Sequence, residues 1–156
     1  MQFGFYLPNN GPTARPGPLA EIARRGDALG YHCMVVGDHI LVPKNIDSTY
    51  PYTVKGEFPG GESGEYLEQL TLLTFLVGIT HNIRLVPSVM IVPYRNPLLT
   101  AKMLATIDVL SKGRLTLGVG VGHIIFDIRS ADLNQTTERM AWFAEEVMRD
   151  DKEVQL

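Results

Sequence analysis

The 156-residue chain contains a single cysteine, no long apolar run and no marked excess of either charge. Cys33 alone cannot form a disulfide within the chain, so no internal disulfide is expected. No stretch reaches the roughly 18 apolar residues that a membrane-spanning helix needs. The first residues also lack the basic start and apolar run of a signal peptide. We therefore expect a cytoplasmic protein with no membrane partner.

The composition excludes two further classes of function. A formal net charge of -3 gives no reason to expect a nucleic-acid partner. The four histidines have no metal-ligand spacing relative to one another or to Cys33, so we predict no metal site. With 45% hydrophobic and 20% charged residues, the chain has the composition of one globular domain with a real core.

The most informative pattern lies between residues 83 and 122. It predicts a strand at residues 83–92, a helix at 97–110 and a second strand at 115–121. Asn96 can cap this helix and Pro97 fits its first turn, while we expect Ala101, Leu104, Ala105 and Leu110 to face inward. Two parallel strands need such a crossover helix, and sites in parallel sheets lie where the strands end. We therefore look for a site around residues 89–96 and 118–123.

The rest of the chain repeats this alternation. Further strands are predicted at residues 3–7, 33–36 and 123–128, and further helices begin at Pro18, near Tyr66 and after Asp132. A long segment rich in proline and glycine, residues 41–64, separates the second strand from the second helix, and loops of this length are usually functional or disordered. The pattern indicates an α/β fold of four to five parallel strands with helices on the outside.

Several motifs together resemble one known family. They are FGFYLPN at the start, VVGDH from residue 35, SVMIVPYRNP from residue 88 and AKMLATIDVLSKGRLTLGVGVG from residue 101. The chain resembles the luciferase-like monooxygenase superfamily, and most closely its branch of oxidoreductases dependent on coenzyme F420. Residues 1–122 are similar to the N-terminal half of that family's barrel, and residues 123–150 to its last strand and helix. Residues 151–156 form a tail.

The resemblance implies an incomplete barrel. The family folds as a (β/α)8 barrel of TIM type, which typically needs about 250 residues. This chain resembles units one to three, strand four and unit eight, with the middle of the barrel missing. A half barrel exposes two sheet edges and an apolar inner face, so we expect it to be completed by a homo-oligomer.

The resemblance also implies a site. In the similar F420 enzymes a histidine at the position of His39 lies against the cofactor, which makes His39 the expected catalytic residue and Asp38 its neighbour in the site. Ser88 and Val89, following Pro87, fall where the family places a non-prolyl cis peptide behind the ring, although the sequence leaves the isomer open. Gly120 would let the backbone approach the cofactor closely.

Each of these residues also has a plain structural interpretation. Asp38 and His39 could simply cap a strand, Pro87 to Val89 could belong to an ordinary core strand, and Gly120 could ease packing. Two functions therefore stay open. The first is an oxidoreductase that uses F420, or alternatively FMN, for hydride transfer with a small organic substrate, some relatives having oxygen as acceptor. The second is a non-catalytic half barrel that binds flavin weakly or acts as an assembly module.

Overall fold

The computed structural model describes residues 1–40, 42, 49–50, 53–58 and 66–122. The strand predicted at residues 123–128, the helix predicted after Asp132 and the tail lie outside the described residues. Three strands, β1 (Gly4–Tyr6), β2 (Cys33–Val36) and β3 (Arg84–Pro87), form a parallel sheet in that order. The predicted α/β architecture with parallel strands is therefore confirmed.

The sheet continues beyond β3 along residues 114–120. The amide of Leu85 donates to the carbonyl of Arg114 at 2.9 Å, and the amide of Thr116 donates back to Leu85 at 3.0 Å. Further on, β4 (Met90–Ile91) pairs in parallel with β5 (Val119–Gly120). The chain thus reaches a fourth strand position on the far side of β3, as the βαβ pattern predicts.

The prediction of one long strand at residues 83–92 is wrong in its extent. This segment is divided into β3 and β4, and the peptide bond between Ser88 and Val89, which lies between them, is cis. The strand predicted at residues 115–121 is also shorter, because only β5 and an isolated bridge between Leu85 and Leu115 are paired there. Alternation of apolar residues does not reveal such an interruption, since the side chains on both sides of it remain apolar.

Three helices connect the strands: α1 (Pro16–Ala28), α2 (Gln69–Val77) and α3 (Pro97–Ser111). Helix α1 begins two residues before the expected Pro18, because Pro16 fits a first turn equally well. Helix α2 begins at Gln69 rather than near Tyr66. A short 3-10 helix, η1 (Val92–Tyr94), precedes α3. No helix among the described residues is long and apolar enough to cross a bilayer.

Helix α3 confirms its predicted cap and part of its predicted buried face, since Leu104 is buried and Ala101 is half-buried. The side chain of Asn96 accepts the amide of Leu99 at 3.1 Å. Ala105 and Leu110, expected to face inward, are exposed. The buried positions of the helix are Thr100, Leu104, Ile107 and Ser111. Thr100 and Ser111 can be buried because their hydroxyls donate to carbonyls of the preceding turn, which satisfies these polar groups locally.

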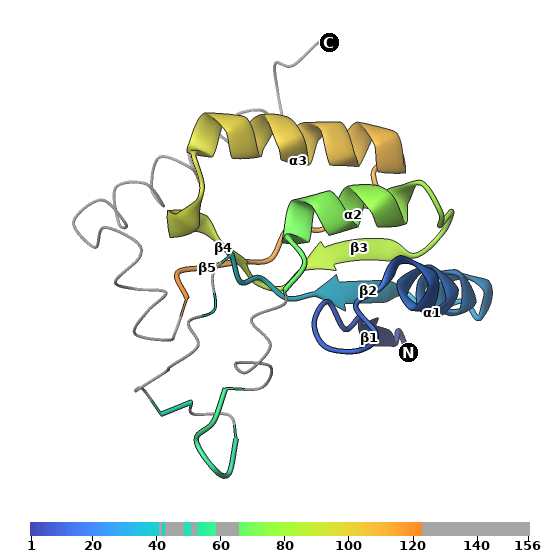
Figure 1. The fold of residues 1–156 in the computed structure, drawn as a ribbon. Helices are drawn as coiled ribbons and strands as arrows, with labels where there is room; N and C mark the ends of the chain where they lie inside the picture. Colours follow the sequence, from blue (N-terminus) through green and yellow to red (C-terminus); the bar gives the residue numbers. More distant parts are fainter. Residues whose placement is uncertain (41, 43–48, 51–52, 59–65, 123–156) are drawn as a thin grey trace.

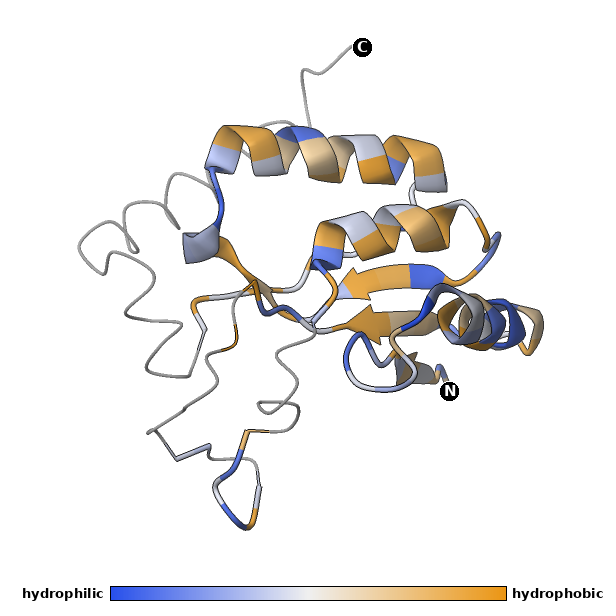
Figure 2. Cartoon of the chain, viewed as in Figure 1, coloured by the Kyte–Doolittle hydropathy of each residue, from blue (hydrophilic) through white to orange (hydrophobic). Residues whose placement is uncertain are grey.

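The hydrophobic core lies between the sheet and the helices. Figure 1 shows α2 next to β3 and α3 on the far side of α2, and Figure 2 shows apolar residues on the strands of the sheet. Met34, Val36 and Leu85 point from β2 and β3 into this core. The opposite face of the sheet is more open, since Tyr6 on β1 is 53% exposed and its neighbours Val35 and Val86 are half-buried.

Candidate functional site

The predicted site residues gather at the carboxyl ends of the parallel strands. Asp38 and His39 follow β2, and Pro87 ends β3. Ser88 and Val89 lie between β3 and β4, while Gly120 lies in β5 beside β4. Because all these strands are parallel, their carboxyl ends form one edge of the sheet. The structure thus brings all six predicted residues to one end of the fold.

Asp38 is buried in a network of polar contacts. Its side chain is only 1% exposed. One carboxylate oxygen accepts the backbone amide of Ile91 at 2.7 Å, and both oxygens accept bonds from the guanidinium of Arg95. Asp38 therefore joins the end of β2 to β4, and its carboxylate is fully used by protein groups.

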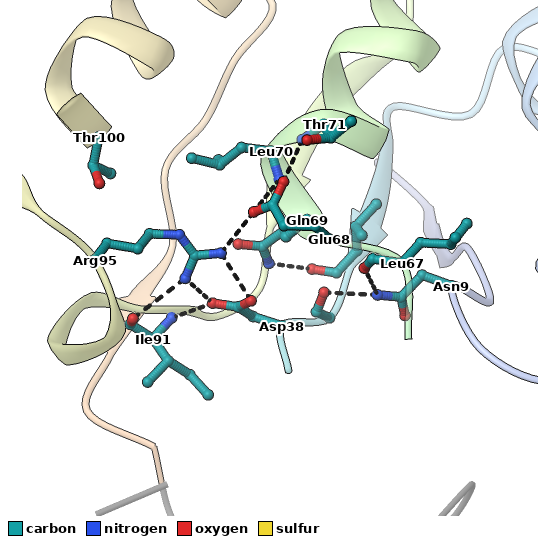
Figure 3. A network of polar contacts seen from close by, with 12 residues as sticks. Asn9, Asp38, Leu67, Glu68, Gln69, Leu70, Thr71, Ile91, Arg95 and Thr100 are labelled. Atoms are coloured by element: carbon teal, nitrogen blue, oxygen red, sulfur yellow. Dashed lines mark hydrogen bonds and ion pairs between the residues drawn. The ribbon is translucent and has the colours of Figure 1, made fainter. Parts of the chain in front are cut away.

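Arg95 is the centre of this network, which Figure 3 shows. Its side chain is 8% exposed and donates to Asp38, to Glu68 at 3.0 Å and to the carbonyl of Ile91 at 3.3 Å. Burial works to lower the pKa of Arg95, but the carboxylates of Asp38 and Glu68 outweigh burial and raise the pKa above its ordinary value. The guanidinium is therefore charged at every physiological pH.

Glu68 completes the network and begins α2. Its carboxylate accepts the amides of Leu70 at 3.1 Å and Thr71 at 2.7 Å, as an N-cap does. Partial burial acts to raise the pKa of Glu68, yet the hydrogen bonds from Thr71 and Leu70 and the bond from Arg95 lower it overall. Asp38, Arg95 and Glu68, which we call the carboxyl-end triad, thus link three elements through one cation.

His39 lies among aromatic rings. Its ring centre is 4.8 Å from that of Phe58 and 5.0 Å from that of Tyr66, both in edge-on geometry. Phe58 in turn contacts Tyr50 at 5.1 Å. Phe58 and Tyr50 belong to the described parts of the long segment at residues 41–64, and of these two Phe58 contacts His39 directly. Burial raises the pKa of Tyr66 to about 12, which keeps its phenol protonated.

The glycines of the fourth strand position pack tightly against the region between β3 and β4. A Cβ added at Gly118 would lie 2.7 Å from the carbonyl oxygen of Pro87, and one at Gly120 would lie 2.8 Å from a methyl carbon of Val89. These contacts favour the packing interpretation of both glycines. Direct contact of Gly120 with a cofactor stays a prediction. Ser88 is exposed, and Val89 is 42% exposed.

Sequence reasoning missed Arg95, Glu68 and two buried amides. Gln69 is fully buried and donates to the carbonyl of Val36 at 2.8 Å, while its own amide oxygen has no partner among the described groups. Asn9, also fully buried, donates to the carbonyl of Gly37 at 3.0 Å. Only Arg95 had a usable signal, because it follows an apolar strand at the end where sites lie. Among the described residues no three His, Cys, Asp or Glu side chains cluster as a metal site would require.

The chain is similar in sequence to several curated proteins. An uncharacterized protein of Mycobacterium tuberculosis is 31% identical over 118 residues, which covers 76% of this chain and 36% of that protein. A phthiodiolone/phenolphthiodiolone dimycocerosates ketoreductase of Mycobacterium bovis is 34% identical over 108 residues, covering 68% of this chain and 28% of the relative. The chain thus spans about a third of the length of these curated relatives.

Solved structures show the same fold. The monooxygenase RslO1 from Streptomyces bottropensis has a TM-score of 0.65 at 25% identity, covering 96% of this chain and 42% of that one. An F420-dependent secondary alcohol dehydrogenase bound to an F420-acetone adduct has a TM-score of 0.65 at 19% identity, with 99% and 42% covered. The oxygenating component of a Baeyer-Villiger monooxygenase from Pseudomonas putida, bound to FMN, has a TM-score of 0.64 at 16% identity, with 94% and 39% covered.

A sequence profile decides the family. The profile described as luciferase-like monooxygenase matches residues 1–146, which is nearly the whole chain. The match includes the motifs around Asp38, Ser88 and Gly120 and agrees with the parallel strand order of the sheet. The chain belongs to the luciferase-like monooxygenase family.

Proposed function

We propose that this chain supplies part of the cofactor site of an oxidoreductase that transfers hydride between F420 and a small organic substrate, with FMN as the alternative cofactor. One observation carries the proposal. The hydrogen bond from the amide of Ile91 to Asp38 ties the end of β2 to β4, so that His39 and Val89 come from neighbouring strands at the same end of the sheet.

The residues present fit the ring of such a cofactor. Val89 offers a 42% exposed isopropyl group that packs closely against Gly120. Pro87 is buried and rigid, and supports the same region. His39 is half-buried and lies among aromatic side chains, which form a mostly apolar surface with few competing charges. In this proposal Asp38 acts through Ile91 and Arg95, since its carboxylate is already occupied.

The chemistry divides between cofactor and protein. When bound, reduced F420 or a reduced flavin would supply the hydride. In this proposal Val89 and Pro87 exclude water from one face of the ring, and the imidazole of His39 exchanges a proton with the substrate. The phenol of Tyr66, whose pKa is raised by burial, donates hydrogen bonds without ionising at neutral pH. Phe58 packs edge-on against His39, so a substrate that reaches His39 would lie beside this ring.

Two of the similar structures support these cofactor classes, because one is described as an F420 complex and the other as an FMN complex. The ketoreductase relative favours a carbonyl or alcohol substrate, whereas the monooxygenase relatives favour molecular oxygen as acceptor. We infer carbonyl and alcohol chemistry first, since the resemblance of the motifs is closest to the F420 branch. A monooxygenase reaction with reduced flavin is the alternative.

Fluorescence titrations with F420 and with FMN test the proposal. We expect saturable binding of one of them by the wild-type chain and about tenfold weaker binding by His39→Asn. His81→Asn is the matched control, since His81 is exposed in the turn before β3, at the other end of the sheet. Absence of binding by a chain with a native circular dichroism spectrum would contradict the proposal, and so would equal losses in both variants.

A second candidate is an assembly module whose copies pair into a homo-oligomer. The observation that favours it is the exposed apolar surface: Tyr6 lies on the open face of the sheet, and α3 exposes Leu98 at 74% and Val109 at 60%. Large exposed apolar surfaces on soluble proteins can mark sites of protein–protein contact. Light scattering over a range of dilutions tests this candidate, and a monomer at every concentration would rule it out.

A further inference from the structure

We propose that Arg95 is a positioning residue that fixes Val89 relative to His39 and thereby sets the gap into which a cofactor ring would fit. The part that concerns the cofactor rests on the proposed function. Arg95 falls within the stretch 89–96 where a site is expected, but it is not one of the six residues predicted for the site. Its contacts hold β2, β4 and the start of α2 at once.

Arg95 and Asp38 enclose the backbone of Ile91. The amide of Ile91 donates to Asp38 at 2.7 Å, and its carbonyl accepts a bond from Arg95 at 3.3 Å. The same guanidinium nitrogen also donates to Asp38. Both backbone polar groups of Ile91 are therefore held by a charged pair. Because Ile91 is two residues after Val89, holding its backbone restricts where Val89 can lie.

The other side of Arg95 holds the start of α2. Its second terminal nitrogen bonds Asp38 and Glu68, both at 3.0 Å. Glu68 caps α2, and the next residue, Gln69, donates to the carbonyl of Val36 at the end of β2. The position of β2, from which His39 follows, is thus fixed by the same group that fixes β4.

The arrangement requires arginine. A guanidinium presents several donors in a rigid plane and can bond a carboxylate through two nitrogens at once, whereas an ammonium is a single point charge. Arg95 uses its two terminal nitrogens for four acceptors, and the side chain is almost completely buried, so water cannot easily replace a lost bond. A lysine at this position would keep the charge and lose the geometry.

The contacts exclude direct chemistry by Arg95. Its donors are committed to Asp38, Glu68 and Ile91, and its side chain is 8% exposed. It acts through the two segments that carry His39 and Val89. A purely structural ion pair would affect the stability of the whole domain, whereas a positioning residue would change the local opening of β4 and the affinity for the ring.

Hydrogen exchange with mass spectrometry, combined with F420 and FMN titrations, separates these roles in the full chain. The variants are Arg95→Lys and, as matched control, Arg114→Lys, in which an arginine at the opposite end of the sheet is changed in the same way. Measurements are made where circular dichroism shows every variant folded. If Arg95→Lys does not fold, Asp38→Asn replaces it, since it removes the same pair from the other side.

We expect Arg95→Lys to speed exchange in peptides covering residues 86–94 by about tenfold or more and to weaken cofactor binding by a similar factor. Arg114→Lys should speed exchange only near residues 77–84 and 111–115 and leave binding unchanged. Unchanged exchange at residues 86–94 in Arg95→Lys would overturn the inference, and so would unchanged affinity despite faster exchange. If the wild type binds neither cofactor, the proposed function fails, and the exchange result alone decides whether Arg95 fixes β4.

Discussion

The two ends of the sheet carry different kinds of charged network. At the amino end, Asp27 accepts the backbone amides of His81, Asn82 and Ile83 at 2.7 to 2.9 Å. At the carboxyl end, the triad of Asp38, Arg95 and Glu68 pairs charges with one another. Side chains at the amino end therefore complete the hydrogen bonds of a turn, whereas those at the carboxyl end hold separate elements in register beside His39.

The arginines at the two ends of the sheet, Arg114 and Arg95, also differ in the kind of group that they bind. Arg114 donates to four backbone carbonyls and to the hydroxyl of Thr80, with distances from 2.8 to 3.5 Å. Burial lowers the pKa of Arg114, and the charge of Asp27 only partly opposes this, whereas two carboxylates raise the pKa of Arg95. An arginine among neutral acceptors fixes the turn before β3. An arginine between two carboxylates couples three elements.

Replacing each arginine by methionine should give the largest difference in stability between the two ends of the sheet. Arg95→Met leaves the buried carboxylate of Asp38 without its cation, which we expect to lower the free energy of unfolding by about 3 to 5 kcal/mol. Arg114→Met removes hydrogen bonds to neutral groups that water can partly reach, so about 1 to 3 kcal/mol is expected. Urea unfolding followed by circular dichroism measures both, and equal losses would contradict the proposed difference between the two ends.

The sequence predicted the order of elements but not this network. Periodicity and capping residues act within a few positions, so the strands, α3 and the cap at Asn96 could be identified locally. Asp38 and Arg95 are 57 positions apart, and Arg95 and Glu68 are 27 apart. No local pattern encodes such pairs. The resemblance implied that Asp38 lies beside the cofactor, and that contact stays a prediction. The structure shows instead the bonds of Asp38 to Ile91 and Arg95.

The buried face of α3 illustrates a second limit. Apolar residues occur all around this helix, so the choice of Ala105 and Leu110 as inward positions had no strong polar face to guide it. Thr100 and Ser111 are buried instead, because their hydroxyls bond to their own helix. Side chains that satisfy themselves locally are invisible to a pattern that counts only apolar residues.

The two glycines of the fourth strand position, Gly118 and Gly120, should affect different properties when they are replaced by alanine. Gly118→Ala would place a Cβ against the backbone carbonyl of Pro87, which cannot rotate away, so we expect a loss of about 1 to 3 kcal/mol in stability. Gly120→Ala would instead meet side-chain atoms of Val89, with Cγ2 at 2.8 Å and Cβ at 3.4 Å, and a side chain can shift more easily than a backbone carbonyl. Its stability loss should be smaller, and its effect should appear mainly in cofactor affinity. Thermal unfolding and titration of both variants test this, and a larger stability loss for Gly120→Ala would contradict it.

Acid should weaken both networks through their carboxylates. Partial burial acts to raise the pKa values of Asp27 and Glu68, but hydrogen bonds from amides and the nearby arginines lower both overall. A carboxylate with a lowered pKa in the folded state adds stability above its unfolded pKa and loses it as pH falls through the folded pKa. We therefore expect the melting temperature to fall below about pH 4.5, the ordinary pKa of glutamate.

Glu68→Gln and Asp27→Asn separate the two contributions to this acid response. Each should flatten the fall in melting temperature between about pH 5 and pH 2, because the substituted amide does not titrate. Glu68→Gln should also weaken cofactor binding in the proposed site, whereas Asp27→Asn should not, since the carboxylate of Asp27 bonds the turn before β3, at the other end of the sheet. A wild-type curve that rises towards low pH would contradict the assignment of both pKa directions.

The smallest effect should come from an ion pair that belongs to neither network. Arg25 and Glu21 lie one turn apart on α1 at 4.0 Å, with side chains 76% and 66% exposed. Water and salt screen such a pair, so Arg25→Ala should change stability by about 0.5 kcal/mol or less. Urea unfolding at low and high salt tests this value. A loss comparable to that of Arg95→Met would mean that charge alone stabilises the fold, and that burial between strands is not what distinguishes the carboxyl-end triad.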